Sequence, residues 1–567
     1  MLPSVPVLRD GQERTSRDTR VLHDVHGEPL AEIHEAPALV TRTTVRAMRR
    51  AATVPQDDRL AALAEAGRLF AKGTPGGQSP EEYCHMQALA SGVPVSVARA
   101  TLNRVADDCA RLGEIIARQT PAGATTEDST PLGWTVARHI PAGAATDHAS
   151  PGWTVARHTP AGAATNNALP GEASTRRAPG GAATEDSGPL GRNVARHIPT
   201  GATTDDYAPL GWTVARQTPT GAAIDDSALP GETATHQPPA APARTARWVR
   251  RGRVFGVVAP SNHPATHGAW LQAVAMGYRV AVRPGARDPF TPLRLVRSLL
   301  EAGLAPDSIA LLPGSHAAAD ALVDAADLAL VYGGEDTVAR MRGNDRVLVR
   351  GPGRSKVLVD RPLDDATLDH LVTEIASDGG VRCTNTTAVL TSGDPRELAE
   401  ALAERLARLP VHPVTDERAV LPVRPLREAE GLRALLANSL DGALDVTARH
   451  YSDGPLGVLG EGEGAAALRP AVLCADRSDH PGLRLELPFP CVWVAPWRRA
   501  EGIGPLDDSL ALTLLTEDSA LVEEALDSPG VRTVLHGRVP GWWRDPFLPH
   551  DGYLGQFLQE ARGYAAP

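Results

Sequence analysis

A tandem repeat divides this chain of 567 residues and limits what it can fold into. Residues 120–237 contain six copies of a unit of 19 or 20 residues, in which Pro, Gly, Ala, Thr and Asp predominate. A period near 20 residues can build a solenoid. However, each unit holds at most one short apolar cluster, too little buried surface to offset the entropy of ordering the chain. We therefore predict a disordered low-complexity insertion, with an extended set of short hairpins as the alternative.

The segments on either side of the repeat have the pattern of an α/β protein. Residues 238–360 alternate apolar strands with helical stretches, which is typical of a parallel, Rossmann-like sheet. Residues 1–119 combine a short hairpin with apolar residues at helical spacing over 45–70 and over 94–116. We expect 1–119 and 238–360 to form a first domain together.

A second α/β domain is expected over residues 361–530. Helical stretches at 365–377 and 395–409 open it. The remaining segment, 531–567, is expected to return to the first domain or to a partner subunit. A site in the cleft between two such domains is the expected place for chemistry.

Composition excludes several classes of function. The 57 basic and 68 acidic residues give a net charge of −11, which does not suit a nucleic-acid-binding surface. No apolar run approaches the length of a membrane-spanning helix, and the residues after Met1 lack the apolar core of a signal peptide. The five cysteines form no Cys-x-x-Cys pair, so neither a disulfide framework nor a zinc site is indicated. A reducing cytoplasm is the expected compartment.

One of those cysteines stands in an unusual setting. Asp378-Gly379-Gly380-Val381-Arg382 leads into Cys383, and Thr and Asn follow. A thiol after such a glycine-rich segment can approach a carbonyl carbon without steric obstruction, and thiolate is the most nucleophilic side chain at neutral pH. The alternative is that Cys383 is a small buried hydrophobic residue, as most lone cysteines are.

A second segment contains an asparagine at the end of a strand. Residues 254–258 are apolar and β-branched, and they stop at a loop in which Pro260 and Pro264 bracket Asn262. A side-chain amide at the carboxyl end of a strand can donate a hydrogen bond to a developing oxyanion. Alternatively, Asn262 caps a helix that begins near Ala265.

Two further strands end in residues suited to a phosphate. One is followed by Arg283 and Arg287, although a surface salt bridge is the default for a single arginine. The other, 328–332, runs into Gly333 and Gly334. A turn without side chains would let a dinucleotide pyrophosphate approach the backbone closely.

This order of strands, loops and helices, followed by the cysteine, resembles the aldehyde dehydrogenase superfamily. Five motifs of the family have counterparts here, namely the Pro-x-Asn-x-Pro loop at 260–264, the Lys-Pro-x-x loop at 283–286, the Phe-Thr-Gly-Ser turn at 331–334, the nucleophile motif at 379–383 and the Glu-x-Phe-Gly-Pro segment at 486–490. The resemblance implies a fold with a Rossmann-type cofactor domain and an α/β catalytic domain.

The resemblance also implies roles for particular residues. Cys383 would be the nucleophile, and the Asn262 amide with the backbone N–H of Cys383 would hold the oxyanion. Glu486 would contact the nicotinamide ribose. The residues implied to bind the cofactor are Ser261, Arg283, Pro284, Arg287, Gly333, Gly334, Glu486 and Phe489.

The chain departs from the family at the residue that activates water. Typical members carry Glu-Leu-Gly-Gly-Lys, whose glutamate is the general base, whereas the corresponding stretch here is 350–356, Arg-Gly-Pro-Gly-Arg-Ser-Lys. Loss of a general base should slow hydrolytic deacylation by on the order of 10²–10⁴-fold. A CoA-type thiol needs no such base. This stretch and residues 549–555 look like the acyl-CoA reductase branch, which contains the fatty-acid reductases of bacterial luminescence.

We therefore expect reduction of an acyl thioester to an aldehyde through an acyl-Cys383 enzyme. The first alternative is an NAD(P)-dependent dehydrogenase that oxidises aldehydes to acids, with Lys356 or His263 in place of the lost glutamate. The second is a non-catalytic scaffold on a degenerate enzyme fold, which the retention of Asn262, Cys383 and Glu486 together opposes.

The cofactor is expected to be NADPH rather than NADH. Family members that prefer NAD place a glutamate where this chain has Ala286, and Arg287 follows. The expected partners are acyl-CoA or another activated acyl donor, an acyl-activating or carrier protein, and further copies of the chain. His550 and Asp551 either help to bind substrate or pantetheine or form a plain turn, and Cys491 is expected to be structural.

Overall fold

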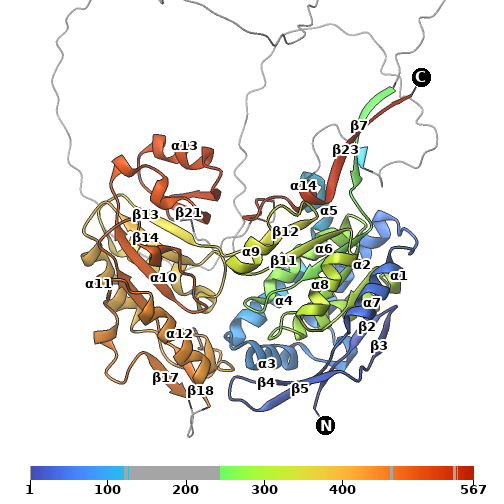
Figure 1. The fold of residues 1–567 in the computed structure, drawn as a ribbon, viewed down its shortest axis with the longest axis horizontal. Coiled ribbons are helices and arrows are strands. Elements are labelled where there is room, and N and C mark those ends of the chain that lie inside the picture. The colour runs from blue at the N-terminus through green and yellow to red at the C-terminus, as the bar shows by residue number, and fades with distance from the viewer. Residues whose placement is uncertain are drawn as a thin grey trace, which may run out of the picture. The chain divides into compact units, whose positions relative to one another are not determined.

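The computed structural model describes residues 2–119, 125–126, 243–459, 464–539, 545 and 547–566. These residues belong to one compact unit, which comprises 1–133 and 240–567. Two seven-stranded sheets form its framework (Figure 1). Apart from Thr125 and Thr126, the predicted repeat insertion lies outside the described residues.

The first sheet has the strand order β12-β11-β8-β9-β10-β2-β3. Its first five strands are parallel, and β2 and β3 add an antiparallel edge. Their bounds are β2 Val7–Arg9, β3 Gln12–Arg14, β8 Val254–Val258, β9 Arg279–Arg283, β10 Ile309–Leu311, β11 Leu328–Tyr332 and β12 Val347–Arg350. The chain runs from β8 outward through β9 and β10 and then returns to the other side of β8 at β11, so the carboxyl end of β8 is a topological switch point, where such sheets bind ligands.

Helices cover both faces of the first sheet, which explains why β8 is apolar along its whole length. Phe255 and Val257 pack in the core under α2, α6 and α7, whereas Val254 packs on the opposite face under α1 and α8. The helices of this part are α1 Ala38–Met48, α2 Gln56–Lys72, α3 Pro80–Ser91, α4 Val95–Ala110, α5 Leu112–Arg118, α6 Gly268–Ala275, α7 Phe290–Glu301, α8 His316–Ala325 and α9 Glu335–Met341.

Two predicted helical stretches are each divided in the structure. The stretch 45–70 contains the end of α1 and most of α2, because Pro55 cannot continue a helix and adopts an extended ψ of 151°. The stretch 94–116 breaks at Arg111, whose φ of −107° and ψ of 6° are not helical. The break between α4 and α5 turns the chain at the position where both helices reach the cavity described below.

The second sheet has the order β16-β19-β20-β14-β13-β21-β22 and is parallel except for β16. Its strands are β13 Ser355–Val359, β14 Thr386–Thr391, β16 Leu444–Asp445, β19 Ala471–Cys474, β20 Cys491–Pro496, β21 Ser509–Leu515 and β22 Val531–His536. Its helices are α10 Asp365–Ala376, α11 Pro395–Leu406, α12 Leu426–Asn438 and α13 Ser519–Asp527. Alternate residues of β13 and β14 face two separate apolar cores, one on each side of the sheet.

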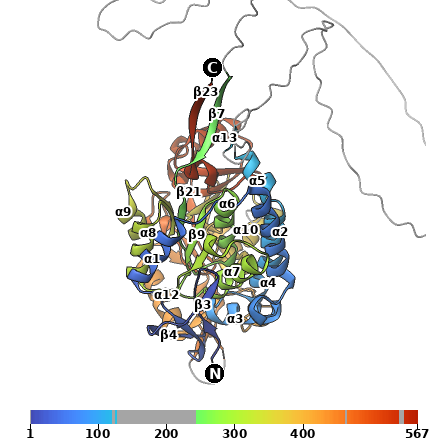
Figure 2. The same cartoon turned by 90° about the vertical axis from the view of Figure 1, so that its right-hand side faces the viewer.

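Three small sheets complete the described residues. They comprise β1 Ser4–Val5, β5 Pro29–His34 and β4 Thr19–His23, then β15 Val423–Pro425, β18 Ala465–Leu468 and β17 Leu456–Leu459, and lastly β23 Gln559–Ala566, β7 Ala243–Arg250 and β6 Thr125–Thr126. Strands β7 and β23 pair over eight residues and project as a ribbon (Figure 2).

The C-terminal segment 531–567 contacts both domains, whereas the sequence indicated a return to the first domain or to a partner subunit. It contributes β22 to the second sheet before helix α14, Leu554–Leu558, packs into the core of the first domain. No helix among the described residues is long and apolar enough to cross a membrane.

Candidate active site

Cys383 lies in a tight turn just before β14. Asp378, Gly379 and Gly380 have positive φ angles of 54°, 75° and 67°. A Cβ on Gly380 would lie 2.5 Å from the backbone nitrogen of Pro490, so only glycine fits there. Gly379 and Gly380 therefore shape the backbone that positions the thiol.

A buried ion-pair network ties this turn to the loop after β8. Nδ1 of His263 accepts a hydrogen bond from the backbone N–H of Ala265, so Nε2 carries the proton and donates to Oδ2 of Asp378 at 3.1 Å. Arg382 lies 3.5 Å from the same oxygen. Burial opposes ionisation of Asp378, but His263, Arg382 and Arg104 together lower its pKa to about 2. His263 is thus committed to holding the turn, which argues against it as the general base.

Gly353 and Glu486 support the nucleophile from the other side. A Cβ on Gly353 would lie 1.7 Å from the carbonyl oxygen of Cys383. Ser355 Oγ donates to that carbonyl oxygen at 3.0 Å. Oε2 of Glu486 accepts from the backbone N–H groups of Gly353 at 2.6 Å and Arg354 at 3.3 Å. Burial raises the pKa of Glu486, although these hydrogen bonds oppose the shift.

Asn262 lies in the loop after β8 and lines the same cavity as Cys383. Its Nδ2 donates to the carbonyl oxygen of Val381 at 2.9 Å. An amide nitrogen carries two N–H donors, so this bond orients Asn262 and leaves the second donor for a ligand. The structure thus brings Asn262 and Cys383 together, as the sequence predicted, and Asn262 does not cap a helix.

A guanidinium occupies the position where the family motif has the glutamate. Arg350 ends β12 and forms an ion pair with Asp551, with 3.3 Å between Nε and Oδ2. It also donates to the hydroxyl of Tyr332 at 3.0 Å. Charge from Arg350 lowers the pKa of the Cys383 thiol, but burial and the nearby carboxylates outweigh it.

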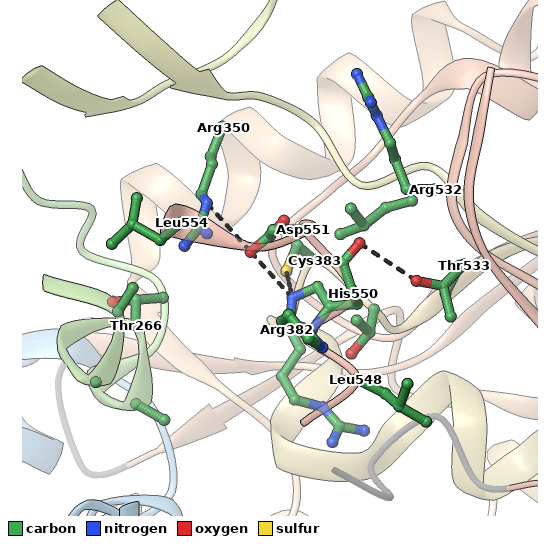
Figure 3. A pocket seen from close by; sticks show the side chains of 18 of the residues that line it. Thr266, Arg350, Arg382, Cys383, Arg532, Thr533, Leu548, His550, Asp551 and Leu554 are labelled. Atoms are coloured by element: carbon green, nitrogen blue, oxygen red, sulfur yellow. Dashed lines mark hydrogen bonds and ion pairs between the residues drawn. The ribbon is translucent and has the colours of Figure 1, made fainter. Parts of the chain in front are cut away.

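His550 lies beside the nucleophile. Its Nε2 is 3.7 Å from Cys383 Sγ and 3.4 Å from Asp551 Oδ2 (Figure 3). Thr533 Oγ1 donates to the backbone carbonyl of His550 at 3.3 Å. Burial, followed by the charges of Asp551 and Glu486, raises the pKa of Cys383 to about 12, so the resting thiol is protonated. From the sequence, His550 could be either a substrate-binding residue or part of a plain turn. Its position beside Cys383 could not be predicted, because 167 residues separate the two.

These residues surround a cavity of about 470 Å³. Its apolar lining comes from α5, β22 and the C-terminal segment, with Leu112, Ile115, Val534, Leu535, Leu548 and Leu554. Charged side chains of Arg104, Asp108, Arg382, Arg532 and Asp545 also reach it. A substrate with an apolar body can therefore reach the thiol.

The candidate cofactor residues of the first domain gather at the carboxyl ends of β8, β9 and β11. Ser261 Oγ accepts from the backbone N–H of Arg287 at 3.1 Å, which joins two of these loops. A Cβ on Gly334 would meet nothing within 4 Å, so the backbone stands open there, whereas a Cβ on Gly333 would lie 2.4 Å from Cβ of Thr337. This edge fits a dinucleotide, since parallel sheets of this kind bind them at the switch point.

Both predicted phosphate-binding arginines have protein partners. Arg283 Nε donates to the carbonyl of Gly314 at 3.0 Å, beside the predicted Pro284. Arg287 forms an ion pair with Glu428 at 2.5 Å. Because Glu428 competes for it, Arg287 is less available to a 2′-phosphate than the sequence suggested.

Phe489 is placed differently from the prediction. It is 1 % exposed and packs in the core of the second domain with Arg433 over its ring. Since so little of the ring surface is exposed, Phe489 supports the Glu486 segment from within and is not placed to contact a cofactor.

Two other side chains considered in the sequence are structural here. Lys356 Nζ donates to the carbonyls of Asp507 and Asp508 and to Ser509 Oγ, so it is fully used, although burial lowers its pKa to about 8. Cys491 is buried in the core of the second domain. Among the residues that the structure covers, no cluster of His, Cys, Asp or Glu could hold a metal ion.

Comparisons with known proteins agree with this architecture. Residues 233–502 match the aldehyde dehydrogenase family. The structure aligns with an NAD-dependent benzaldehyde dehydrogenase from Corynebacterium glutamicum at a TM-score of 0.65 and 16% identity, covering 99% of this chain and 98% of that chain. It also aligns with an indole-3-acetaldehyde dehydrogenase of P. syringae solved with NAD+, at a TM-score of 0.68 and 14% identity over 100% of this chain and 97% of that one.

Curated relatives match a shorter segment. A malonate-semialdehyde dehydrogenase of Halalkalibacterium halodurans is 28% identical over 166 residues, which is 27% of this chain and 33% of the relative. An acylating methylmalonate-semialdehyde dehydrogenase of Arabidopsis thaliana, a mitochondrial protein, is 26% identical over 196 residues, or 32% of each chain. The match thus spans about a third of these relatives. The family match over residues 233–502, the shared fold and the motifs around Cys383 together make this chain similar to the aldehyde dehydrogenase family.

Proposed function

We propose that this protein is an NAD(P)-linked oxidoreductase that reduces an acyl thioester to an aldehyde through an acyl-Cys383 enzyme. The proposal rests mainly on the presence of Arg350 at the position of the general base. Where hydrolytic dehydrogenases hold a carboxylate that activates water, this chain holds a guanidinium paired with Asp551. A guanidinium stays protonated and cannot accept a proton from water.

The chain's own residues would act as follows. Cys383 attacks the acyl carbon, and the thiol carrier leaves. Asn262 and the backbone N–H of Cys383 hold the oxyanion, worth roughly 3–4 kcal/mol per well-placed donor. The apolar side chains of the cavity hold the acyl chain and exclude water from the thioester. Reduced nicotinamide, when bound at the carboxyl edge of the first sheet, supplies the hydride.

The name of the plant relative is consistent with thioester chemistry, because it is called acylating. All of these relatives are called dehydrogenases, and the names without the word acylating leave a second candidate, oxidation of an aldehyde to an acid. That activity would require a base other than the missing carboxylate. A non-catalytic scaffold is opposed by the convergence of Asn262, Cys383 and His550 on one cavity.

The choice of NADPH over NADH stays a prediction that rests on Ala286 and Arg287. The acyl donor, a carrier-protein partner and assembly into homo-oligomers are likewise proposals. The apolar lining of the cavity favours an acyl group with an apolar body over a small charged one.

The proposal is tested by following reduced-nicotinamide absorbance in both directions. One reaction contains acyl-CoAs of increasing chain length with NADPH or NADH, and the other contains the matching aldehydes with oxidised cofactor, with and without CoA. Thioester-dependent loss of NADPH that is absent in Cys383→Ala is the expected result. Sustained aldehyde oxidation without CoA would favour the second candidate.

A further inference from the structure

We propose that His550 accepts the proton of the Cys383 thiol as the sulfur attacks the acyl carbon. In the family motif a glutamate can act as a base, but this chain has Arg350 at that position. A residue of the C-terminal segment would thus act as the base instead. The identity of the acyl donor rests on the proposed function, whereas the proton transfer itself does not depend on it.

The geometry of the two side chains carries this proposal. Nε2 of His550 is 3.7 Å from Sγ of Cys383, and both line one cavity (Figure 3). Sulfur is larger than oxygen, and catalytic hydrogen bonds are often longer before a substrate is bound. The imidazole therefore stands within reach of the proton that must be removed.

A base is needed because the thiol is held in its neutral form. Burial, Asp551 and Glu486 raise the pKa of Cys383 to about 12, and only the thiolate is a strong nucleophile. A general base that removes the proton during attack avoids forming a free thiolate in this setting.

The charged groups around His550 favour the proton after transfer. Asp551 Oδ2 is 3.4 Å from the same Nε2, so an imidazolium formed there has a carboxylate partner. Arg350, from β12, holds Asp551 in place through the ion pair at 3.3 Å. Arg382 and Arg532 reach the same cavity from the nucleophile turn and from β22, and both oppose a second positive charge.

The backbone that carries the imidazole is held by contacts of its own segment. Thr533 Oγ1 donates to the His550 carbonyl, and the backbone N–H of Gly552 donates to the carbonyl of Pro549 at 3.0 Å. Leu554 and Leu558 anchor the following helix in the core of the first domain, at 2 % and 0 % exposure. These contacts fix the backbone from which the imidazole reaches Sγ, and proton transfer depends on such positioning.

The other basic groups near the thiol have structural duties. Nε2 of His263 donates to Asp378, and Lys356 Nζ is used by three oxygen atoms. Glu486 Oε2 accepts from two backbone N–H groups. His550 differs from these three residues because its Nε2 faces Sγ of Cys383.

The step conserves atoms and charge. The S–H proton of Cys383 passes to Nε2 while sulfur bonds to the acyl carbon and the carbonyl electron pair moves to oxygen. The oxyanion then re-forms the carbonyl and breaks the bond to the carrier sulfur. The leaving thiolate takes the proton from the imidazolium, which leaves acyl-Cys383, a free carrier thiol and neutral His550.

The test follows the modification of Cys383 without any nicotinamide. Full-length wild type, His550→Gln and His550→Ala are mixed with decanoyl-CoA or with iodoacetamide, and adduct formation is timed by intact-protein mass spectrometry from pH 6 to 9.5. His536→Gln is the matched control, because His536 is exposed on β22 and its Nε2 lies 3.0 Å from the carbonyl oxygen of Thr516. Imidazole is added to His550→Ala as a chemical rescue.

The expected result is a fall of about 10²–10⁴-fold in both reactions for the two His550 variants. Their residual rate should rise about tenfold per pH unit without levelling, because Cys383 has a pKa of about 12. Imidazole should restore His550→Ala at least tenfold, while His536→Gln reacts like wild type.

Reaction of the His550 variants at the wild-type rate would overturn the proposal. So would a loss in His550→Ala that imidazole does not restore, since that would mark a positioning role. If no acyl-CoA modifies wild type while iodoacetamide still shows the dependence on His550, the proton transfer stands and the thioester proposal fails.

Discussion

The α-carbon of Gly353 packs directly against the carbonyl group of Cys383, so that a Cβ there would lie 1.7 Å from the carbonyl oxygen. Gly353 also donates its N–H to Glu486 at 2.6 Å. One residue just before β13 thus joins the nucleophile to the segment that is expected to contact the cofactor. The relative position of the two depends on the absence of a side chain.

Gly353→Ala should therefore disturb the site. The methyl group must displace the Cys383 backbone, which we expect to lower the free energy of unfolding by about 1–3 kcal/mol and to reduce the rate of Cys383 modification. Thermal denaturation and alkylation kinetics check this. Gly431→Ala is the control, because a Cβ at that position of α12 meets nothing within 4 Å, and stability should rise by about 0.5–1 kcal/mol. Equal behaviour of the two variants would contradict the account.

Asp378→Asn should make stability less dependent on pH. The folded-state pKa of Asp378 is lowered to about 2, so the ionised group stabilises the fold above its unfolded value near 4 and loses that effect as pH falls toward 2. We expect the variant to be less stable by about 2 kcal/mol at pH 7 and the difference to vanish near pH 2. Urea denaturation over that range measures it. Glu404→Gln, in an exposed pair with Arg408, should change stability by less than about 0.5 kcal/mol.

Glu486→Gln should have opposite effects on the thiol and on the cofactor. The amide oxygen can still accept from Gly353, but the negative charge that helps to raise the pKa of Cys383 is removed. Alkylation at pH 8 should become faster, by up to about tenfold. The KM for the nicotinamide cofactor should rise. If alkylation slows instead, Glu486 acts on the thiol by some route other than its charge.

Asn262→Ala should slow turnover without affecting the thiol's own reactivity. Loss of one oxyanion donor is expected to lower kcat by about 10²–10³-fold. Iodoacetamide forms no oxyanion, so alkylation of Cys383 should stay within about twofold of wild type. A parallel loss in both assays would show that Asn262 acts by holding the Val381 carbonyl and hence the turn.

Arg287→Ala tests the cofactor preference. If Arg287 exchanges its bond to Glu428 for a 2′-phosphate, the KM for NADPH should rise roughly tenfold while the KM for NADH is unchanged. Glu428→Gln should lower the KM for NADPH. Steady-state kinetics with both cofactors decide, and an unchanged ratio of the two KM values would contradict the prediction.

Strands β8 and β11 of the first domain could be predicted because each is a short apolar run with a Pro or Gly close behind it. Residues 254–258 and 328–332 coincide with β8 and β11. The order of motifs then placed Asn262 and Cys383 in one site. By contrast, the division of 45–70 into two helices was missed. Pro55 marks it in the sequence, but the apolar residues on both sides of Pro55 have helical spacing and suggest one continuous helix.

Contacts over long sequence separations could not be predicted. His550 reaches Cys383 only because the C-terminal segment passes from β22 in the second sheet to the core of the first domain. Likewise, Glu428 lies 141 residues from Arg287, and no local pattern announces their ion pair. Phe489 belongs to a motif that matched the family, yet its burial is set by the packing of the second core.

In the proposed reaction the acyl group on Cys383 is released to a thiol and not to water. We would measure the reduced nicotinamide formed when enzyme and aldehyde are mixed with oxidised cofactor without CoA. We expect a burst of one equivalent per active site, an acyl adduct on Cys383 by mass, and further turnover only when CoA is added. Continuous formation of the acid without CoA would contradict it.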